Sequence, residues 1–259
     1  QNVDALLLVG GKGTRLQAVV NDRPEPMAQV NGKPFVEWLI HSLRLQGIRR
    51  FILCTGHMGG LIQEYFGDGK RFGIEIEYSL ESSPLGTGGA IRNALSLIQS
   101  PNCLILNGDS YCRFNVQYLL HQHLLLDAGA SLWLTQVDDC SRYGSVTIAN
   151  NGAVQAFIEK SAVPRSGLIS AGVYLIQRQL IATWASDQAI SIEKEIFPAL
   201  IGNGLYGVTG GFTNESAFID IGTPESYQAS SVVLQQELTL IQKAITQEQQ
   251  TAYQQRASQ

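Results

Sequence analysis

Short apolar runs alternate with helix-forming patterns through the first half of the chain, and this alternation is the strongest constraint on its fold. The apolar runs predict buried strands, and the segments between them show the apolar spacing of amphipathic helices. Strands that alternate with helices in this way form a parallel sheet joined by right-handed crossovers. The predicted strands are 5–9, 50–55, 74–79, 103–107 and 131–137, and the predicted helices are 34–46, 60–66, 87–99 and 116–128.

The second half has a different pattern. The segment 145–159 predicts a hairpin around an Asn-Asn-Gly turn, and 167–176 predicts another strand. Ser191 is placed to cap a short helix, and a further strand leads to a helix that starts near Pro224. We therefore expect an α/β fold with a doubly wound, Rossmann-like, mixed but mostly parallel sheet, a small additional lobe and a C-terminal helix. The expected boundaries are one domain over 1–230, with halves at about 1–138 and 139–230, and a helical extension over 231–259.

Composition excludes several classes of protein. The 259 residues are 44% hydrophobic, enough for one large core with an appended lobe. The net charge is −4 and there is no basic block, which argues against a nucleic-acid partner. No apolar run approaches the roughly 20 residues of a membrane span, and the first residues do not resemble a signal peptide. The polar, glutamine-rich C-terminal helix needs a partner, and contact with a second copy in a homo-oligomer is one explanation.

The cysteines and histidines do not predict a metal or disulfide site. The four cysteines form no C-x-x-C pair, so we expect them to be reduced and structural, in a cytoplasmic protein. His121 and His123 are two residues apart on a predicted helix and point to different sides. We expect both to be solvated rather than metal ligands.

A glycine-rich loop, GGKGTRL over 10–16, follows the first predicted strand. Glycines allow backbone N–H groups to converge on one point, and the loop adds two cations, so it is suited to phosphate. The dinucleotide fingerprint needs a third glycine where Leu16 stands, and the Walker loop needs a Gly-Lys-Ser/Thr triplet that the chain lacks. An ordinary strand-to-helix turn remains the alternative. Asn107, Gly108 and Asp109 end another strand at the same expected edge of the sheet, where ligands of such folds bind.

Several motifs occur together in one order: GGKGTRL, PEPMAQVNGKP, SPLGTGGA, LNGD, RYGSV, FIEK, SAGVYLI, SIEKEIFPAL and FIDIGTPESY. Over about residues 4–230 the chain resembles the sugar-nucleotide pyrophosphorylases, which are sugar-1-phosphate nucleotidyltransferases with a GT-A-like fold. Within that family it is most similar to the heptose-1-phosphate and mannose-1-phosphate guanylyltransferases. The resemblance implies a Mg²⁺-dependent enzyme that joins a nucleoside triphosphate, GTP by this similarity, to a sugar 1-phosphate and releases pyrophosphate.

The resemblance also implies site residues. Asp109 and Asp220 would hold Mg²⁺, and Arg15, Lys160 and Asp109 would act in the reaction. Tyr143 and Gly144 would face the sugar, while Glu159 and Glu193 would accept hydrogen bonds from its hydroxyls. Lys160 would pair with the sugar phosphate. The expected nucleotide-binding residues are Val9, Gly10, Gly11, Lys12, Gly13, Thr14, Glu81, Pro84, Leu85, Gly86, Thr87, Gly88, Asn107 and Gly108, and Ser170 and Gly172 complete the expected sugar site.

Two positions depart from the family pattern. Ser170 stands where the family usually has Asn, and Glu25 stands where it usually has Lys between two prolines. A negative charge beside the triphosphate is costly, because phosphate-neutralising groups contribute several kcal/mol to such reactions. Lys12 or Arg23 could supply the missing charge, Glu25 could bind a second metal ion, or the chain could be a nucleotide-sugar-binding regulatory protein with weak activity. Transfer from CTP, UTP or dTTP to another phosphorylated acceptor is the alternative within the enzyme class.

Overall fold

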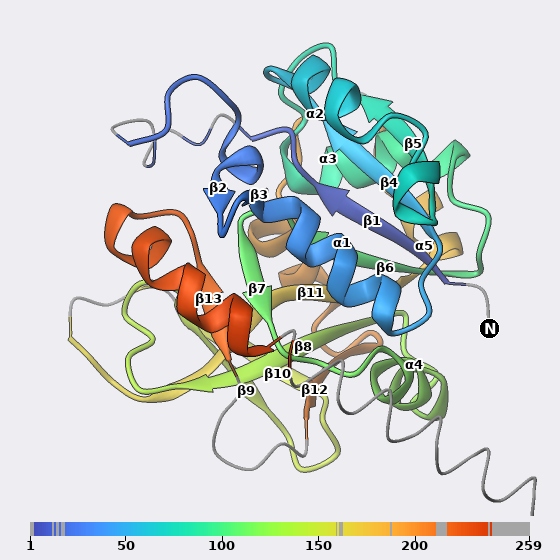
Figure 1. Cartoon of the computed structure of the whole chain (residues 1–259). Coiled ribbons are helices and arrows are strands. Elements are labelled where there is room, and N and C mark those ends of the chain that lie inside the picture. The colour runs from blue at the N-terminus through green and yellow to red at the C-terminus, as the bar shows by residue number, and fades with distance from the viewer. Residues whose placement is uncertain are drawn as a thin grey trace, which may run out of the picture.

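The centre of the molecule is a seven-stranded sheet with the order β12-β8-β11-β6-β1-β4-β5 (Figure 1). The computed structural model describes residues 3–11, 13, 16, 19–158, 160, 163–186, 188–210, 217–237 and 239. Strand β11 is antiparallel to both of its neighbours, and every other adjacent pair is parallel. The mixed, mostly parallel sheet is therefore confirmed. Its strands are β1 Asp4–Leu8, β4 Arg50–Thr55, β5 Glu75–Leu80, β6 Asn102–Asn107, β8 Ala130–Val137, β11 Gly167–Gln177 and β12 Leu205–Thr209.

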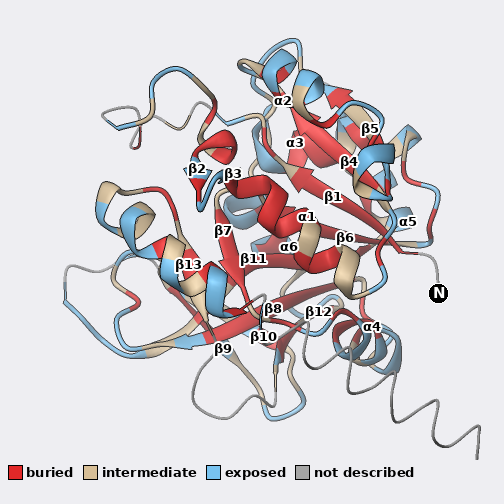
Figure 2. Cartoon of the chain, viewed as in Figure 1, coloured by how far each residue is buried: buried red, intermediate tan, exposed pale blue. Residues whose placement is uncertain are grey.

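Helices cover both faces of this sheet. On one face, apolar residues of α1, α2 and α4 share a core cluster with Leu7, Leu53 and Leu106. On the other face, α3 and α5 pack on Leu6, Ile52 and other strand residues. These residues alternate along the strands with those of the first cluster, because successive side chains of a strand point to opposite faces of the sheet. The central strands are accordingly buried on both sides (Figure 2), as expected for parallel strands. The helices are α1 Phe35–Leu45, α2 Gly59–Phe66, α3 Gly86–Asn93, α4 Val116–Leu125, α5 Arg178–Ala182 and α6 Phe197–Leu200.

The second half of the chain completes the same sheet and adds small pairs of strands. The predicted hairpin is β9 Ser145–Ile148 with β10 Val154–Ile158. A second pair joins β7 Ser110–Cys112 to β13 Phe218–Asp220, and a third joins β2 Gln29–Val30 to β3 Lys33–Pro34. Strands β11 and β12 from this half lie beside strands from the first half, so the halves expected at about residue 138 share one sheet.

The helix after β13 packs on its own domain. Residues 224–237 are helical without a break at 230. Leu234 is buried in a third core cluster with residues of α1, β7 and β13, and the Glu237 carboxylate forms a bidentate ion pair with Arg113. The first turns of the C-terminal helix thus find a partner within the chain.

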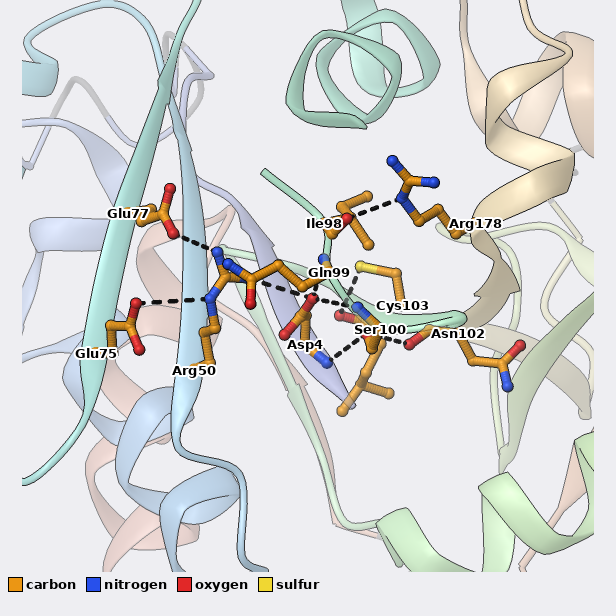
Figure 3. A network of polar contacts seen from close by, with 11 residues as sticks. Asp4, Arg50, Glu75, Glu77, Ile98, Gln99, Ser100, Asn102, Cys103 and Arg178 are labelled. Carbon is orange, nitrogen blue, oxygen red and sulfur yellow. Dashed lines mark hydrogen bonds and ion pairs between the residues drawn. The ribbon is translucent and has the colours of Figure 1, made fainter. Parts of the chain in front are cut away.

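A polar network ties the sheet together at the edge where β1 begins (Figure 3). The Asp4 carboxylate accepts hydrogen bonds from the backbone N–H groups of Gln99 and Ser100, at 2.6 and 2.8 Å. Arg50 of β4 pairs with Asp4 at 3.2 Å and with Glu77 of β5. These bonds link three adjacent strands at the end of the sheet opposite to the predicted site.

Two sequence expectations about single residues have different outcomes. All four cysteines are free and buried, as predicted. The expectation that His123 is solvated is wrong: its side chain is 1% exposed and contacts Ser131 Oγ at 2.8 Å and Asn102 Oδ1 at 3.3 Å. This burial lowers the pKa of His123 to about 4.

In the described part of the chain, no helix has the length and apolar character needed to span a membrane.

Candidate active site

Two adjoining cavities lie at the edge of the sheet where β1, β4, β5 and β6 end. The larger has a volume of about 810 Å³ and the smaller about 290 Å³. Asn107 and Asp109, which follow the buried part of β6, line both. Parallel strands end together at this edge, which explains why polar residues distant in sequence meet there.

The larger cavity is built on close approaches of backbone. A Cβ at Gly10 would lie 2.9 Å from Glu81 Oε1 and 3.0 Å from the Gly56 nitrogen, so only glycine fits at the end of β1. Gly108 is equally constrained, because a Cβ there would lie 2.5 Å from the Leu8 carbonyl oxygen. The predicted residues in the cavity wall are Gly10, Gly11, Glu25, Glu81, Pro84, Gly86, Thr87, Asn107, Gly108 and Asp109.

Glu25 packs directly against the glycine loop. It begins a short 3-10 helix, Glu25–Met27, and lines the larger cavity. Gly13 has a φ of +57°, and a Cβ there would lie 2.6 Å from Glu25 Cβ and 2.7 Å from Glu25 Oε2. The structure therefore places the unusual carboxylate beside the loop that is expected to hold phosphate.

Glu81 presents a carboxylate at the wall of the larger cavity. It follows β5, and its Oε2 accepts a hydrogen bond of 3.1 Å from the Leu85 backbone N–H. Burial raises the pKa of Glu81 above its usual value, and the bond from Leu85 opposes this shift. The side chain is thus a hydrogen-bond acceptor held in a fixed place, partly withdrawn from water.

The glycines of SPLGTGGA pack mainly against another part of the protein. Gly86 has a φ of +68°, and a Cβ there would lie 2.6 Å from the Ile190 carbonyl oxygen. The Gly88 backbone N–H donates to that same oxygen at 2.8 Å, and Gly88 is not in the cavity wall. Thr87 does not cap α3 but accepts a hydrogen bond of 2.9 Å from the Ile192 N–H. These glycines therefore fix α3 against the segment before Ile192.

The smaller cavity combines residues from six separate segments of the chain. Tyr143 and Gly144 come from the loop before β9, Ser170 and Gly172 from β11, and Asp220 from the end of β13. Gly172 has a φ of +71°, and a Cβ there would lie 2.8 Å from both Asn107 Nδ2 and Ser110 Oγ. The other predicted residues in this wall are Asp109, Lys160 and Glu193.

Glu193 lies on a π-helix, Ile192–Ile196, at the edge of the smaller cavity. Ser191 caps this helix, as expected: its Oγ accepts from the Lys194 N–H at 3.2 Å, and its own N–H donates to Glu195 Oε1 at 2.7 Å. The hydroxyl of the buried Tyr174 donates to Glu193 Oε1 at 2.7 Å. One carboxylate oxygen is therefore held by the protein.

The donor set suits a divalent cation with oxygen ligands. Asp109 and Asp220 both line the smaller cavity, and the Ile221 N–H donates to the Asp109 carbonyl oxygen at 2.8 Å, so the two residues lie on neighbouring backbone segments. Mg²⁺ in proteins is usually bound by one or two carboxylates together with phosphate oxygens and water. Within the described residues there is no group of three or more His, Cys, Asp or Glu side chains placed to hold a metal ion. The residues present thus fit an ion that takes most of its ligands from substrate and water.

Some predicted residues do not line the cavities or cannot be placed. Val9, Gly13 and Leu85 are in neither wall, like Gly88. Lys12, Thr14, Arg15 and Glu159 lie outside the described residues.

Sequence reasoning missed Arg142, Lys194 and His57, which line the cavities. Arg142 directly precedes Tyr143 of the RYGSV motif, and His57 follows the end of β4. The position of His57 after a strand end was therefore a usable signal.

Comparison with known proteins places the chain in a family. A family model described as nucleotidyl transferase matches residues 4–237. The D-glycero-alpha-D-manno-heptose 1-phosphate guanylyltransferase of Aneurinibacillus thermoaerophilus is 35% identical, over 90% of this chain and 99% of that protein. The mannose-1-phosphate guanylyltransferase of Mycobacterium tuberculosis is 36% identical over 90% of this chain, which spans only 64% of that relative.

A solved structure agrees with these relatives. HddC from Yersinia pseudotuberculosis, in a crystal complex with GMP-PN, superposes with a TM-score of 0.78 and 32% identity, covering 88% of this chain and 98% of that one. The fold, the cavity-lining motifs and these matches lead to one conclusion: the chain belongs to the nucleotidyl transferase family.

Proposed function

We propose that the protein transfers GMP from GTP to a heptose 1-phosphate or mannose 1-phosphate, giving a GDP-sugar and pyrophosphate. The observation that carries this proposal is the shared wall of the two cavities at Asn107 and Asp109. A nucleotide in the larger cavity and a sugar phosphate in the smaller one would meet at that wall. The names of the relatives, which are guanylyltransferases for these two sugar phosphates, support the choice of substrates.

The reaction needs positioning and charge neutralisation more than proton transfer. A phosphate oxygen of the sugar 1-phosphate forms a bond to the α-phosphorus of GTP, and the bond from that phosphorus to the β-phosphate oxygen breaks. The attacking oxygen is already an anion, so no general base is required, and orientation of the two substrates is the main contribution. Asp109 and Asp220 would hold Mg²⁺. The chemistry that Mg²⁺ supplies when bound is neutralisation of the phosphate charge.

The protein's own residues then have separate tasks. Gly11, whose Cβ position has no atom within 4 Å, would allow the triphosphate to approach the backbone closely, while Gly10 and Gly108 allow the strand ends around the cavity to pack together. Lys160, which is exposed and lines the smaller cavity, would pair with the sugar phosphate. Arg15 would bind the leaving pyrophosphate. This role stays a prediction, because Arg15 lies outside the described residues.

Glu81 supports guanine as the base. The Watson–Crick edge of guanine offers two adjacent N–H donors, at N1 and N2, that match the two oxygens of one carboxylate. Uracil and thymine offer one N–H between two carbonyl oxygens, which would repel a carboxylate. Cytosine and adenine each place an acceptor beside a single amino group. A carboxylate in the wall of the larger cavity therefore favours GTP among the common nucleotides.

A pyrophosphate-release assay tests this function. The protein would be incubated with Mg²⁺, each common nucleoside triphosphate and a panel of sugar 1-phosphates. We expect release with GTP and a heptose or mannose 1-phosphate, and loss of release in EDTA and in Asp109→Asn. Release with UTP, CTP or dTTP alone would overturn the guanylyl assignment. Binding of GDP-sugar without release from any pair would favour a regulatory binding protein instead.

Glu25→Lys should be run in the same assay, because Glu25 lines the larger cavity beside Gly13. Restoring a cation next to the triphosphate should raise turnover at least several-fold, since such groups contribute several kcal/mol. Glu64→Lys makes the same charge change on the exposed side of α2 and should leave turnover unchanged. A slower Glu25→Lys enzyme would show that the site depends on the carboxylate.

Two further expectations about this protein stay predictions. A homo-oligomer would form through the C-terminal helix, and light scattering on the full chain measures its mass. A cytoplasmic setting is consistent with four free, buried thiols; localisation of a tagged chain tests it.

A further inference from the structure

The carboxylate of Asp220 is surrounded by hydrogen-bond donors. Its Oδ1 accepts from the Gly222 N–H at 3.0 Å and from Arg142 Nη2 at 3.2 Å. Its Oδ2 accepts from the Tyr143 hydroxyl and from Arg142 Nη2 at 3.3 Å. A carboxylate has about four lone-pair positions, and three donor groups make four contacts with them, because Arg142 Nη2 is shared between the two oxygens. A cation that binds Asp220 must therefore replace one donor.

Of the three donors, Arg142 is the one whose departure from the Asp220 carboxylate costs the least free energy. The Gly222 N–H belongs to the turn after β13, and the Tyr143 ring packs edge-on against Phe218 with centroids 5.2 Å apart. The Arg142 side chain is 45% exposed, against 12% for Asp220. An exposed ion pair of this kind is worth about 1 kcal/mol or less, and the long side chain can reorient without moving the backbone.

Arg142 also lies where it can meet a phosphate. It lines the smaller cavity together with Lys160, and its guanidinium stands 5.3 Å from the centroid of the Tyr143 ring. A guanidinium binds phosphate oxygens in a bidentate way that ammonium groups cannot reproduce. The arginine thus has two partners within one cavity: the Asp220 carboxylate and any phosphate that enters.

We propose that Arg142 pairs with Asp220 until a divalent cation binds that carboxylate, and that it then binds the phosphate of the sugar 1-phosphate. The competition between Arg142 and the cation rests on the Asp109–Asp220 cation site. The binding of the sugar phosphate by Arg142 rests on the proposed function. Arg142 keeps the carboxylate neutralised and in place before the cation arrives. The same charge then reaches the second substrate, so cation binding prepares the phosphate site.

The first test measures Mn²⁺ binding to the full chain without nucleotide or sugar, by titration with electron paramagnetic resonance of free Mn²⁺. Removing the competing guanidinium in Arg142→Gln should lower the dissociation constant for Mn²⁺ about fivefold, the equivalent of an ion pair worth about 1 kcal/mol. Arg142→Lys, which keeps a cation but loses the planar guanidinium, should give a dissociation constant between those of the wild type and Arg142→Gln. The double variant Arg142→Gln with Asp220→Asn should not show this gain in Mn²⁺ affinity.

A matched control separates competition from a general effect of charge. Lys194→Gln removes one positive charge from the same cavity wall, and among the described residues it has no contact with Asp220. Its Mn²⁺ affinity should change by less than a third of the Arg142→Gln effect. Equal gains in both variants, or unchanged affinity in Arg142→Gln, would overturn the competition.

The second test uses the reaction itself. Arg142→Gln should raise KM for the sugar 1-phosphate about tenfold, while KM for GTP stays within twofold. An unchanged KM for the sugar 1-phosphate would overturn the phosphate half of the inference. If no substrate pair releases pyrophosphate, the proposed function fails, and the Mn²⁺ titration still decides whether Arg142 and the cation compete for Asp220.

Discussion

The hydroxyl of Tyr174, in the middle of β11, donates a hydrogen bond of 2.7 Å to Glu193 Oε1 on the π-helix beside the smaller cavity. Tyr174 is fully buried, and its ring packs edge-on against Phe197 at 5.0 Å. The core of the sheet thus fixes the orientation of a carboxylate at the cavity wall. Among the described residues, no hydrogen bond reaches the second oxygen of Glu193, and an oxygen at the cavity wall suits a hydrogen bond from a sugar hydroxyl.

Tyr174→Phe should therefore act on the sugar substrate. Without the phenol, Glu193 loses its positioning partner, so KM for the sugar 1-phosphate should rise several-fold with little change in KM for GTP. The free energy of unfolding should fall by about 1 kcal/mol, the usual cost of one such hydrogen bond. Steady-state kinetics and denaturant unfolding measure the two effects.

Tyr65→Phe is the matched control for this prediction. It removes another tyrosine-to-glutamate hydrogen bond, of 2.7 Å to Glu37 Oε2, between α2 and α1. It should lower stability by a similar amount and leave both KM values unchanged. An equal rise in the KM of the two variants would mean that Tyr174 has only a structural role.

The protonation state of Glu81 should set a pH dependence of GTP binding. Burial raises the pKa of this carboxyl, so it takes up a proton at a higher pH than an exposed glutamate as the solution is acidified. The protonated acid can accept fewer hydrogen bonds from guanine, so KM for GTP should rise as pH falls toward that pKa. Glu81→Gln should have a raised KM at neutral pH and a flatter profile. Identical slopes in both proteins would exclude Glu81 from base recognition.

Gly172 supports Asn107, which lines both cavities. Gly172→Ala would place a Cβ 2.8 Å from Asn107 Nδ2 and from Ser110 Oγ, so activity should fall at least tenfold. The control is Gly73→Ala: Gly73 has the same φ of +71°, with no atom within 4 Å of its Cβ position. Both variants should lose about 1 kcal/mol of stability from backbone strain. Only Gly172→Ala should lose activity in the pyrophosphate assay.

His123 should make the protein sensitive to acid. Its pKa is lowered to about 4 by burial, whereas an unfolded chain has the ordinary value near 6.5. The unfolded state therefore binds the proton first, and stability is lost as pH falls between these two values. The free energy of unfolding should decrease by about 3 kcal/mol from pH 7 to pH 4 through this group.

Urea unfolding at a series of pH values measures this dependence. His123→Gln should show a smaller decrease than the wild type, although it is less stable at pH 7. His121→Gln, which changes an exposed histidine on the same helix, should keep the wild-type slope. A wild-type slope in His123→Gln would assign the acid sensitivity to other groups.

Local patterns in the sequence predict the strands and helices of this fold well, because the central strands are short continuous apolar runs and the helices between them carry a periodic apolar face. Strand β4 has the predicted bounds 50–55. Gly10 and Gly11 after β1, and Asn107, Gly108 and Asp109 at the end of β6, line the larger cavity. Contacts between distant segments are less predictable. The SPLGTGGA glycines pack on Ile190, about 100 residues away, and nothing local to that motif reveals this partner.

Single polar residues show the same limit. His123 has the sequence context of a solvated helix residue, and only the packing of α4 on β8 buries it against Ser131. Arg142 stands in an exposed loop, so its pairing with Asp220 depends on a contact across 78 residues. Spacing along the chain carries no information about such pairs, because they form only when the sheet brings its ends together.

The reversed direction of β11 has a consequence for how such a protein can change its substrate. Val137 at the end of β8 pairs with Gly167 at the start of β11, so the intervening residues leave and re-enter the sheet at neighbouring points beside the smaller cavity. This segment, residues 138–166, includes Tyr143, Gly144 and Lys160 of the smaller cavity, while Gly10, Gly11 and Glu81 of the larger cavity lie outside it. Exchange of segment 138–166 between relatives could alter which sugar 1-phosphate is bound and leave the binding of the nucleotide unchanged.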